Sequence, residues 1–196
     1  MSDLPLTVLR RLAAHLGASD VALLNAADIV VEDRLAALCR EPGCEWYGQS
    51  CSCPPHVGGP AVFRKLLEIY PQALAFRIDA PKEVLFSADR REVFHLLHTI
   101  AADLEAAAEK EGFSRAAAFA GGSCKDIFCT DQSDCRVLAI GGSCRHPEAA
   151  RPSLSGFGVN VSHLLQTAEW EDASATGALP DEADNTMPLV GLVLLG

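Results

Sequence analysis

The chain has 196 residues, of which 49% are hydrophobic, so it is long enough to bury one sizeable core. Its formal net charge of −10 disfavours a nucleic-acid partner, because an acidic surface repels the phosphate backbone. The start of the chain lacks a signal-peptide pattern, and no segment has the ~20 apolar residues that a membrane helix needs. We therefore expect a cytoplasmic protein that does not bind membranes.

The first half of the chain alternates predicted helices and strands. Leucines at helical spacing predict a helix over residues 5–16, which Gly17 would end. Residues 21–31 carry two short apolar runs, and the last three of these residues are strand-like. The following elements are an ambiguous segment over 34–39, an irregular loop rich in Cys, Pro, Gly and Ser over 40–60, a helix over 61–70 and a strand over 73–78.

The second half begins with the most regular helical pattern of the sequence, over residues 89–111. Ser87 or Asp89 is expected to cap this helix and Gly112 to end it. The later elements are a short buried strand over 116–120, an irregular Cys-bearing region over 121–152, a short helix over 159–166, an exposed acidic loop over 171–188 and a closing strand over 189–195.

This order of elements predicts an α/β or α+β fold, with a small mixed sheet of about four strands, flanking helices and long Cys-bearing loops at one end. We expect a single metal-binding domain over residues 1–196, and a helical N-terminal extension over residues 1–30 is an alternative for its first part. Loops of this length need an internal organiser, which a bound metal supplies.

Eight cysteines are many for a chain of this length, and they are grouped rather than scattered. Without an export signal we expect reduced thiols, and clustered reduced thiols favour metal over disulfides. The first group comprises Cys39, Cys44, Cys51 and Cys53, and the second comprises Cys124, Cys129, Cys135 and Cys144.

The spacing of the second group bears on the identity of the metal. Four thiolates complete either a [4Fe–4S] cluster or a tetrahedral zinc site. Cys124 and Cys129 lie at the edge of zinc-knuckle spacing, but Cys135 and Cys144 are too far apart in sequence to form a second knuckle. Neighbouring Gly pairs offer free N–H groups to cluster sulfides, so we expect one or two [4Fe–4S] clusters, with zinc as the alternative.

The ligand set of the first group is left open by the spacing alone. Cys51 and Cys53 would share a face of an extended segment, so neither is excluded. With only three thiolates the first site would have an open position, which is where a catalytic metal meets its substrate. His56 and His146 are alternative ligands, although hydrogen bonding within their loops is the preferred interpretation.

Two arginines follow the last cysteine. Arg145 and Arg151 are candidates for binding an anion or a cluster sulfide. The alternative is that this segment starts a helix, with Pro147 in its first turn. Trp46 and Tyr47 flank the first group and would either shield a cluster from water or belong to the core.

Three stretches of sequence carry a family resemblance. They are residues 39–55, residues 121–135 and the run Cys144-Arg-His-Pro-Glu-Ala-Ala-Arg-Pro-Ser153 with Gly158-Val-Asn-Val161 after it. Together they resemble the prokaryotic predicted metal-binding proteins known as domain of unknown function 2284. The resemblance implies metal binding and no particular activity. The cysteines that it places at motif positions are Cys39, Cys44, Cys53, Cys124, Cys129, Cys135 and Cys144.

Two positions depart from the family pattern. Cys51 stands where the family often has a bulky apolar residue, so we leave it out of the predicted ligands. Asn160 stands where Asp is usual, which removes any role for a carboxylate there.

The function that these features favour is electron transfer or redox sensing by an iron–sulfur protein with a protein redox partner. One alternative is a small-molecule redox enzyme whose cluster has an open coordination position, and another is a structural zinc adaptor. The sequence has no Ser-His-Asp pattern, phosphate-binding Gly-rich loop or radical-enzyme Cys-x3-Cys-x2-Cys motif. Whether the chain is an enzyme and how it oligomerises are left open.

Overall fold

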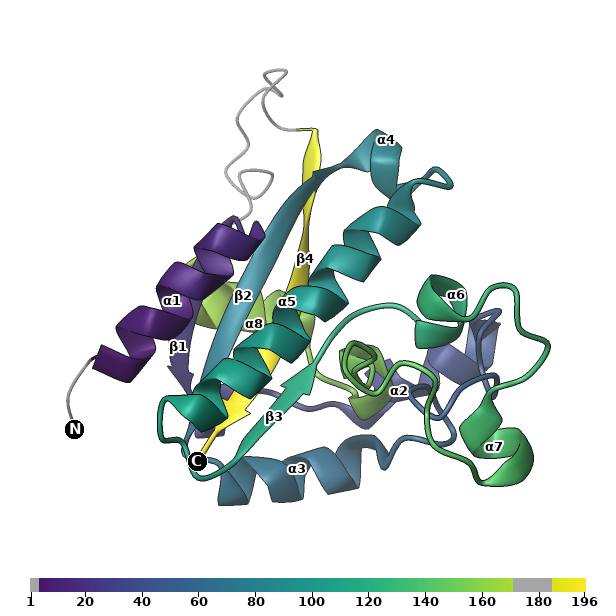
Figure 1. The fold of residues 1–196 in the computed structure, drawn as a ribbon, viewed down its shortest axis with the longest axis horizontal. Helices are drawn as coiled ribbons and strands as arrows, with labels where there is room; N and C mark the ends of the chain where they lie inside the picture. Colours follow the sequence, from purple (N-terminus) through teal and green to yellow (C-terminus); the bar gives the residue numbers. More distant parts are fainter. Residues whose placement is uncertain (1–3, 171–184) are drawn as a thin grey trace.

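The computed structural model describes residues 4–170 and 185–196. Its centre is a four-stranded sheet in the order β1-β2-β4-β3, with helices on both faces (Figure 1). All three pairings are antiparallel, which decides between the two predicted classes in favour of α+β. Parallel pairing is confined to one isolated bridge between Ala120 and Ser153. The strands are β1 (Asp20–Asn25), β2 (Gln72–Pro81), β3 (Ala116–Phe119) and β4 (Thr186–Leu195).

The two faces of the sheet have separate apolar cores because side chains alternate along a strand. On one face, α1 (Leu4–Leu16) and α5 (Arg90–Lys110) pack against alternate residues of β2 and β4 such as Phe76 and Val193. On the other face, α3 (Gly59–Ile69) and α8 (Val161–Thr167) cover the intervening residues, among them Leu192. A sheet buried on both faces explains why its central strands are apolar almost without interruption.

Most of the predicted elements are confirmed to within a few residues. The prediction fails at Ile29–Val31, where Val31 makes only an isolated bridge to Val159, because the chain leaves the sheet at a short 3-10 turn after β1. Residues 171–184 of the predicted acidic loop lie outside the described residues. The last three residues of the predicted loop, 186–188, belong to β4 instead. The short helices that were not assigned from sequence are α2 (Asp33–Ala37), α4 (Lys82–Leu85), α6 (Cys124–Phe128) and α7 (Arg136–Ile140).

Helix α5 carries buried polar side chains as well as an apolar face. His98 is fully buried, its Nε2 lies 3.0 Å from the Gly121 carbonyl oxygen, and the Arg151 N–H donates to its Nδ1 at 3.0 Å. A carbonyl only accepts, so these partners fix the tautomer with the proton on Nε2. Glu105 accepts from the Ala118 N–H at 2.6 Å and pairs with the Arg151 guanidinium at 2.8 Å. Helix α5 therefore fixes both ends of the loop over residues 121–151.

The turn that leaves β3 depends on a glycine. Gly122 has a φ of +76°, and a Cβ added there would lie 2.9 Å from the Phe94 ring of α5. Any other residue would therefore be strained in its backbone and would clash with α5. The next residue, Ser123, caps α6 by accepting a hydrogen bond from the Lys125 N–H. This turn directs the chain from the sheet into the second cysteine region.

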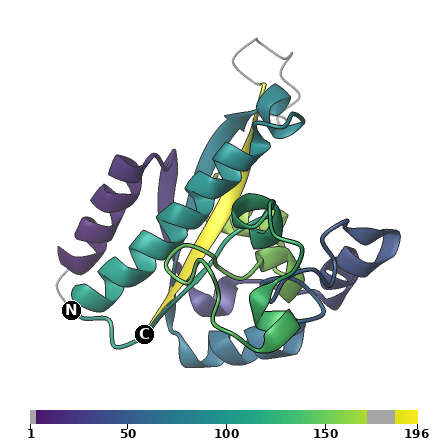
Figure 2. The ribbon, with the colours of Figure 1, turned by 45° about the vertical axis from the view of Figure 1, so that its right-hand side comes forward.

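The cysteine-bearing loops and the sheet occupy opposite sides of the molecule. Figures 1 and 2 both show α6, α7 and the neighbouring loops on one side, with α1 and the C-terminal end of β4 on the other. None of the helices in the described part of the chain is long and apolar enough to cross a membrane.

We predict that the stability of the fold falls as His98 becomes protonated. Burial lowers the pKa of His98 from 6.5 to about 4. Between these values the unfolded chain binds a proton that the folded chain excludes. The free energy of unfolding should therefore fall as the pH drops from 6.5 to 4, by up to about 3 kcal/mol.

Urea denaturation at a series of pH values measures this loss. His98→Gln should be less stable at pH 7 and should lack this part of the pH dependence, whereas His95→Gln, at an exposed position of the same helix, should keep it. Equal pH dependence in the wild type and His98→Gln would contradict the assignment.

Candidate metal centre

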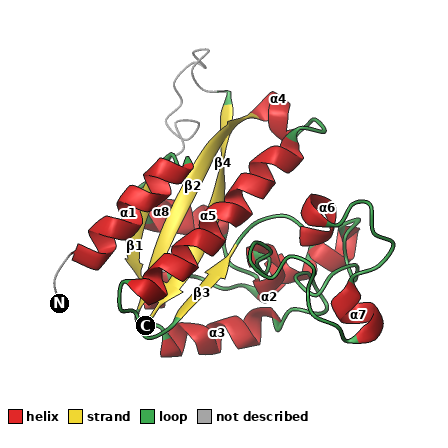
Figure 3. Ribbon diagram, viewed as in Figure 1, coloured by secondary structure: helices red, strands yellow, loops and turns green. Residues whose placement is uncertain are grey.

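All eight cysteines are free thiols and lie in the loops on one side of the molecule. This region contains only short helical segments joined by long loops (Figure 3). Its three sequence motifs are tied together by short contacts. The Ser153 N–H donates to the Ser52 carbonyl oxygen at 3.0 Å, and the Cys53 thiol donates to the Ser123 hydroxyl at 3.3 Å. Segments 70 or more residues apart in sequence therefore meet at this point.

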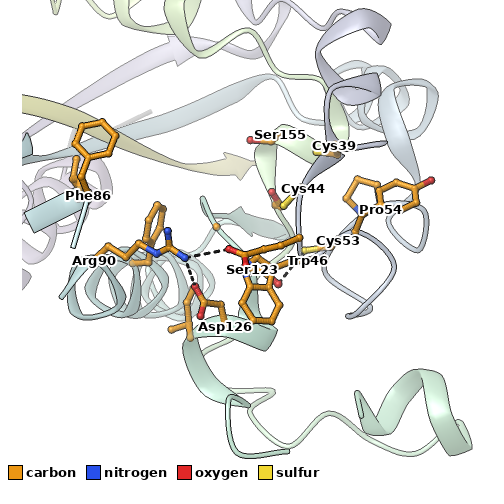
Figure 4. Close-up of a pocket in the computed structure, with 17 residues that line it drawn as sticks. Cys39, Cys44, Trp46, Cys53, Pro54, Phe86, Arg90, Ser123, Asp126 and Ser155 are labelled. Carbon is orange, nitrogen blue, oxygen red and sulfur yellow. Dashed lines mark hydrogen bonds and ion pairs between the residues drawn. The ribbon is translucent and has the colours of Figure 1, made fainter. Parts of the chain in front are cut away.

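The first group of cysteines faces a large cavity. Cys39, Cys44 and Cys53 line a cavity of about 440 Å³, within the usual size range of ligand pockets. Figure 4 shows their sulfurs at one end of this cavity and Phe86 at the other, with Arg90 and Trp46 between them. Burial raises the pKa of Cys39, and the nearby Cys44 and Cys53 raise it further. Cys39 therefore lies within electrostatic reach of the other two thiols.

Charged side chains form a network on the wall of this cavity. Nη2 of Arg90 lies 3.3 Å from a Glu45 carboxylate oxygen and 3.6 Å from an oxygen of Asp126. Arg91, which lies outside the cavity, pairs with Asp126 at 3.0 Å. The two arginines and the two carboxylates balance in formal charge, so the wall is close to neutral apart from the thiols.

The second group contains five cysteines rather than four. Cys51 does not face the first cavity. It lies with the second quartet, although it is only two residues from Cys53. Burial raises the pKa of Cys124, whose sulfur lies beside the Ser52 and Ser50 hydroxyls and near Cys53, so the two groups adjoin each other. The cysteines around this second cavity are Cys51, Cys124, Cys129, Cys135 and Cys144.

Three positive side chains surround the second group. Lys125, Arg136 and Arg145 line the same cavity as the five thiols. Lys125 is only 6% exposed, and its ammonium donates to the Cys129 carbonyl oxygen at 2.7 Å and also to that of Gln132. Burial raises the pKa of Cys129, whereas the charges of Arg145 and Lys125 act in the opposite direction. The environment therefore compensates the negative charge that several thiolates would bring.

The chemistry of the donors limits the kind of metal that they can hold. Among residues 4–170 and 185–196, no three His, Cys, Asp or Glu side chains converge closely enough to hold one metal ion. About 20 Å³ of water-accessible space remains among the five thiols, which is about the size of one water molecule. Thiolates are the donors of both iron–sulfur clusters and structural zinc ions, so this donor set fits either group.

The other predicted site residues are two arginines and two histidines. Arg145 lies at the second cavity and donates from Nη1 to the Asp134 carbonyl oxygen at 3.0 Å. Arg151 instead pairs with Glu105 of α5 and lines neither of the two cysteine cavities. His56 lies 3.3 Å from the Gly48 carbonyl oxygen, and the His146 ring stacks on Phe128, so both make contacts within the protein.

Several residues of the site were not found from the sequence. Asp126, Arg90 and Lys125 carry no recognisable motif, although Lys125 and Asp126 directly follow Cys124. Asn160, which departs from the family pattern, caps α8 by accepting from the His163 N–H at 3.0 Å and donates to Glu32. An Asp there would place a second carboxylate against Glu32, so Asn suits this chain.

The fold and these thiols define an α+β protein with a candidate metal centre at its clustered cysteines. The chain belongs to the family of predicted metal-binding proteins known as domain of unknown function 2284, whose model matches residues 22–195. This confirms the resemblance inferred from the three motifs. Searches of the curated proteins and of the solved structures gave no match.

We predict that Cys135 is alkylated before Cys51 in the metal-free protein. Burial alone would raise the pKa of Cys135, but hydrogen bonds from the backbone N–H groups of Cys51, Leu138 and Val137 outweigh it and lower the pKa. Burial and the neighbouring Cys135 raise the pKa of Cys51 to about 11. At pH 8 the reactive thiolate should therefore form at Cys135 first.

Timed labelling with iodoacetamide, followed by peptide mass spectrometry, measures the order of reaction. Cys135→Ser should accelerate labelling of Cys51, because the neighbouring thiol that raises its pKa is removed. Faster labelling of Cys51 than of Cys135 in the wild type would contradict the hydrogen-bond pattern.

Proposed function

We propose that this protein binds [4Fe–4S] clusters at its two cysteine groups and acts in electron transfer or redox sensing with a protein partner in the cytoplasm. The ligands are Cys39, Cys44 and Cys53 at the first site. At the second site they are Cys124, Cys129, Cys135 and Cys144, and Cys51 is a fifth thiol in contact with Cys135. When bound, the clusters supply one-electron chemistry.

The observation that carries this proposal is the gathering of all eight free thiols around two adjoining cavities. Cysteine-only donor sets suit iron–sulfur clusters and zinc. The spacing of the cysteines along the sequence favours a cluster, because Cys135 and Cys144 are too far apart to form the second knuckle of a zinc site.

The positive side chains of the second site support a role in electron transfer. A [4Fe–4S] cluster with four thiolates is anionic, and its reduction adds a further negative charge. Lys125, Arg136 and Arg145 offset that charge around the cavity.

The two sites are also close to each other and to solvent. Cys53 of the first group contacts Ser123, the residue before Cys124 of the second group. Cys44 is exposed, and Cys39, Cys129, Cys135 and Cys144 are partly exposed. An electron could therefore pass between the sites and on to a docked partner.

We predict that protein purified without oxygen contains about eight irons and eight acid-labile sulfides per chain, since each cluster has four of each. Cys39→Ala should lose the first cluster and Cys144→Ala the second, so that each variant retains about half of the iron. Metal analysis, sulfide assay and absorption spectroscopy measure these contents. Zinc in stoichiometric amount with no sulfide would refute the proposal and leave the cysteines as structural ligands.

We predict that Lys125→Met lowers the reduction potential of the second cluster. Removing a buried positive charge beside the cluster disfavours the added electron, by an amount on the order of tens of millivolts. Redox titration followed by EPR spectroscopy measures the shift. Lys125→Arg, which keeps the charge, is the matched control and should retain most of the wild-type potential. Equal potentials in the wild type and Lys125→Met would contradict the proposed role of Lys125.

A further inference from the structure

Among the described residues, three cysteines and no histidine line the first cavity. Of the other described residues on the cavity wall, Glu45 and Asp126 carry carboxylates, and both are held by arginines. Cys51 and Cys124 line the second cavity instead. His56 does not line the first cavity and contacts the Gly48 carbonyl oxygen. A cluster bound here would therefore have one iron without a cysteine or histidine ligand.

The shape of the first cavity is that of a ligand pocket. Its volume of about 440 Å³ lies within the usual range of ligand pockets, and Phe86 on its wall is 80% exposed. Trp46, Phe86 and Phe94 give it aromatic walls. An apolar body of a few carbon atoms would be removed from water against these rings, which is favourable for binding.

Arg90 provides the polar recognition in this pocket. Both of its ion pairs use Nη2, at 3.3 Å and 3.6 Å. Its Nε and Nη1 groups make no hydrogen bond to any residue in the described part of the chain, and the side chain is 41% exposed. A guanidinium with unused N–H groups is suited to binding a carboxylate through two parallel hydrogen bonds.

We propose that the first site binds a small organic carboxylate with an apolar body, whose acidic group meets Arg90 and the open iron position beside Cys39, Cys44 and Cys53. This inference rests on the proposed iron–sulfur function and specifies the ligand class of its first site. It assigns the second site to electron supply and the first site to small-molecule binding.

The open iron position is tested by mild oxidation of the anaerobic protein with ferricyanide. A [4Fe–4S]2+ cluster with an unprotected iron releases one Fe2+ and passes one electron to ferricyanide, leaving a [3Fe–4S]+ cluster. We expect the EPR signal of about one three-iron cluster per chain in the wild type and in Cys144→Ala, but not in Cys39→Ala. If iron and sulfide are present and the wild type and both variants keep intact four-iron clusters after oxidation, the proposed open iron position is wrong.

The ligand class is tested with benzoate, a carboxylate on a small apolar body. Millimolar benzoate should change the EPR spectrum of the reduced first cluster, and benzamide, its neutral analogue, should not. Arg90→Gln should weaken the benzoate effect at least tenfold, whereas Arg91→Gln, a neighbouring arginine outside the cavity, should not.

Three-iron conversion without any benzoate effect would overturn the carboxylate assignment. Absence of labile sulfide would instead refute the proposed function itself, so the two failures are distinguishable.

Discussion

A neutral imidazole buried beneath the cysteine loops is the constraint on which their arrangement depends. His98 joins the Gly121 carbonyl oxygen to the Arg151 N–H, and Glu105 joins β3 to the Arg151 guanidinium. An unsatisfied polar group at this depth would cost about 1–3 kcal/mol, so these contacts are specific as well as stabilising. Both ends of the loop over residues 121–151 are therefore attached to helix α5. This attachment restricts the positions of the four cysteines between them.

The two cysteine groups differ in charge as well as in number. Lys125, Arg136 and Arg145 surround five thiols in a small cavity, whereas Arg90 faces three thiols in a large one and is balanced by carboxylates. An environment that compensates negative charge suits a group that only gains and loses electrons. The first cavity is open and nearly neutral, and it has unused hydrogen-bond donors, which suits the binding of a ligand. The chain thus offers two different environments to the same kind of donor.

The sequence predicted most of the fold, because the helix over 89–111 and the apolar central strands carry a strong periodic signal. It also indicated two groups of cysteines as candidate metal ligands. It did not predict that Cys51 and Cys53 face different cavities, since an extended segment would have placed them on one face. The segment turns between them, and it contacts Ser123 and Ser153, which are far away in sequence. Arg90 was missed for the same reason: it reaches the site from a helix in another part of the chain.

The separation of the C-terminal end of β4 from the cysteine loops has a practical consequence (Figures 1 and 2). Gly196 ends the sheet on the side opposite both cavities, and its backbone is held there by hydrogen bonds with Arg115. A tether attached after Gly196 would leave both cysteine groups facing away from a support. The protein could then be immobilised on an electrode through that end, with its metal sites exposed to the solution and to any partner added there.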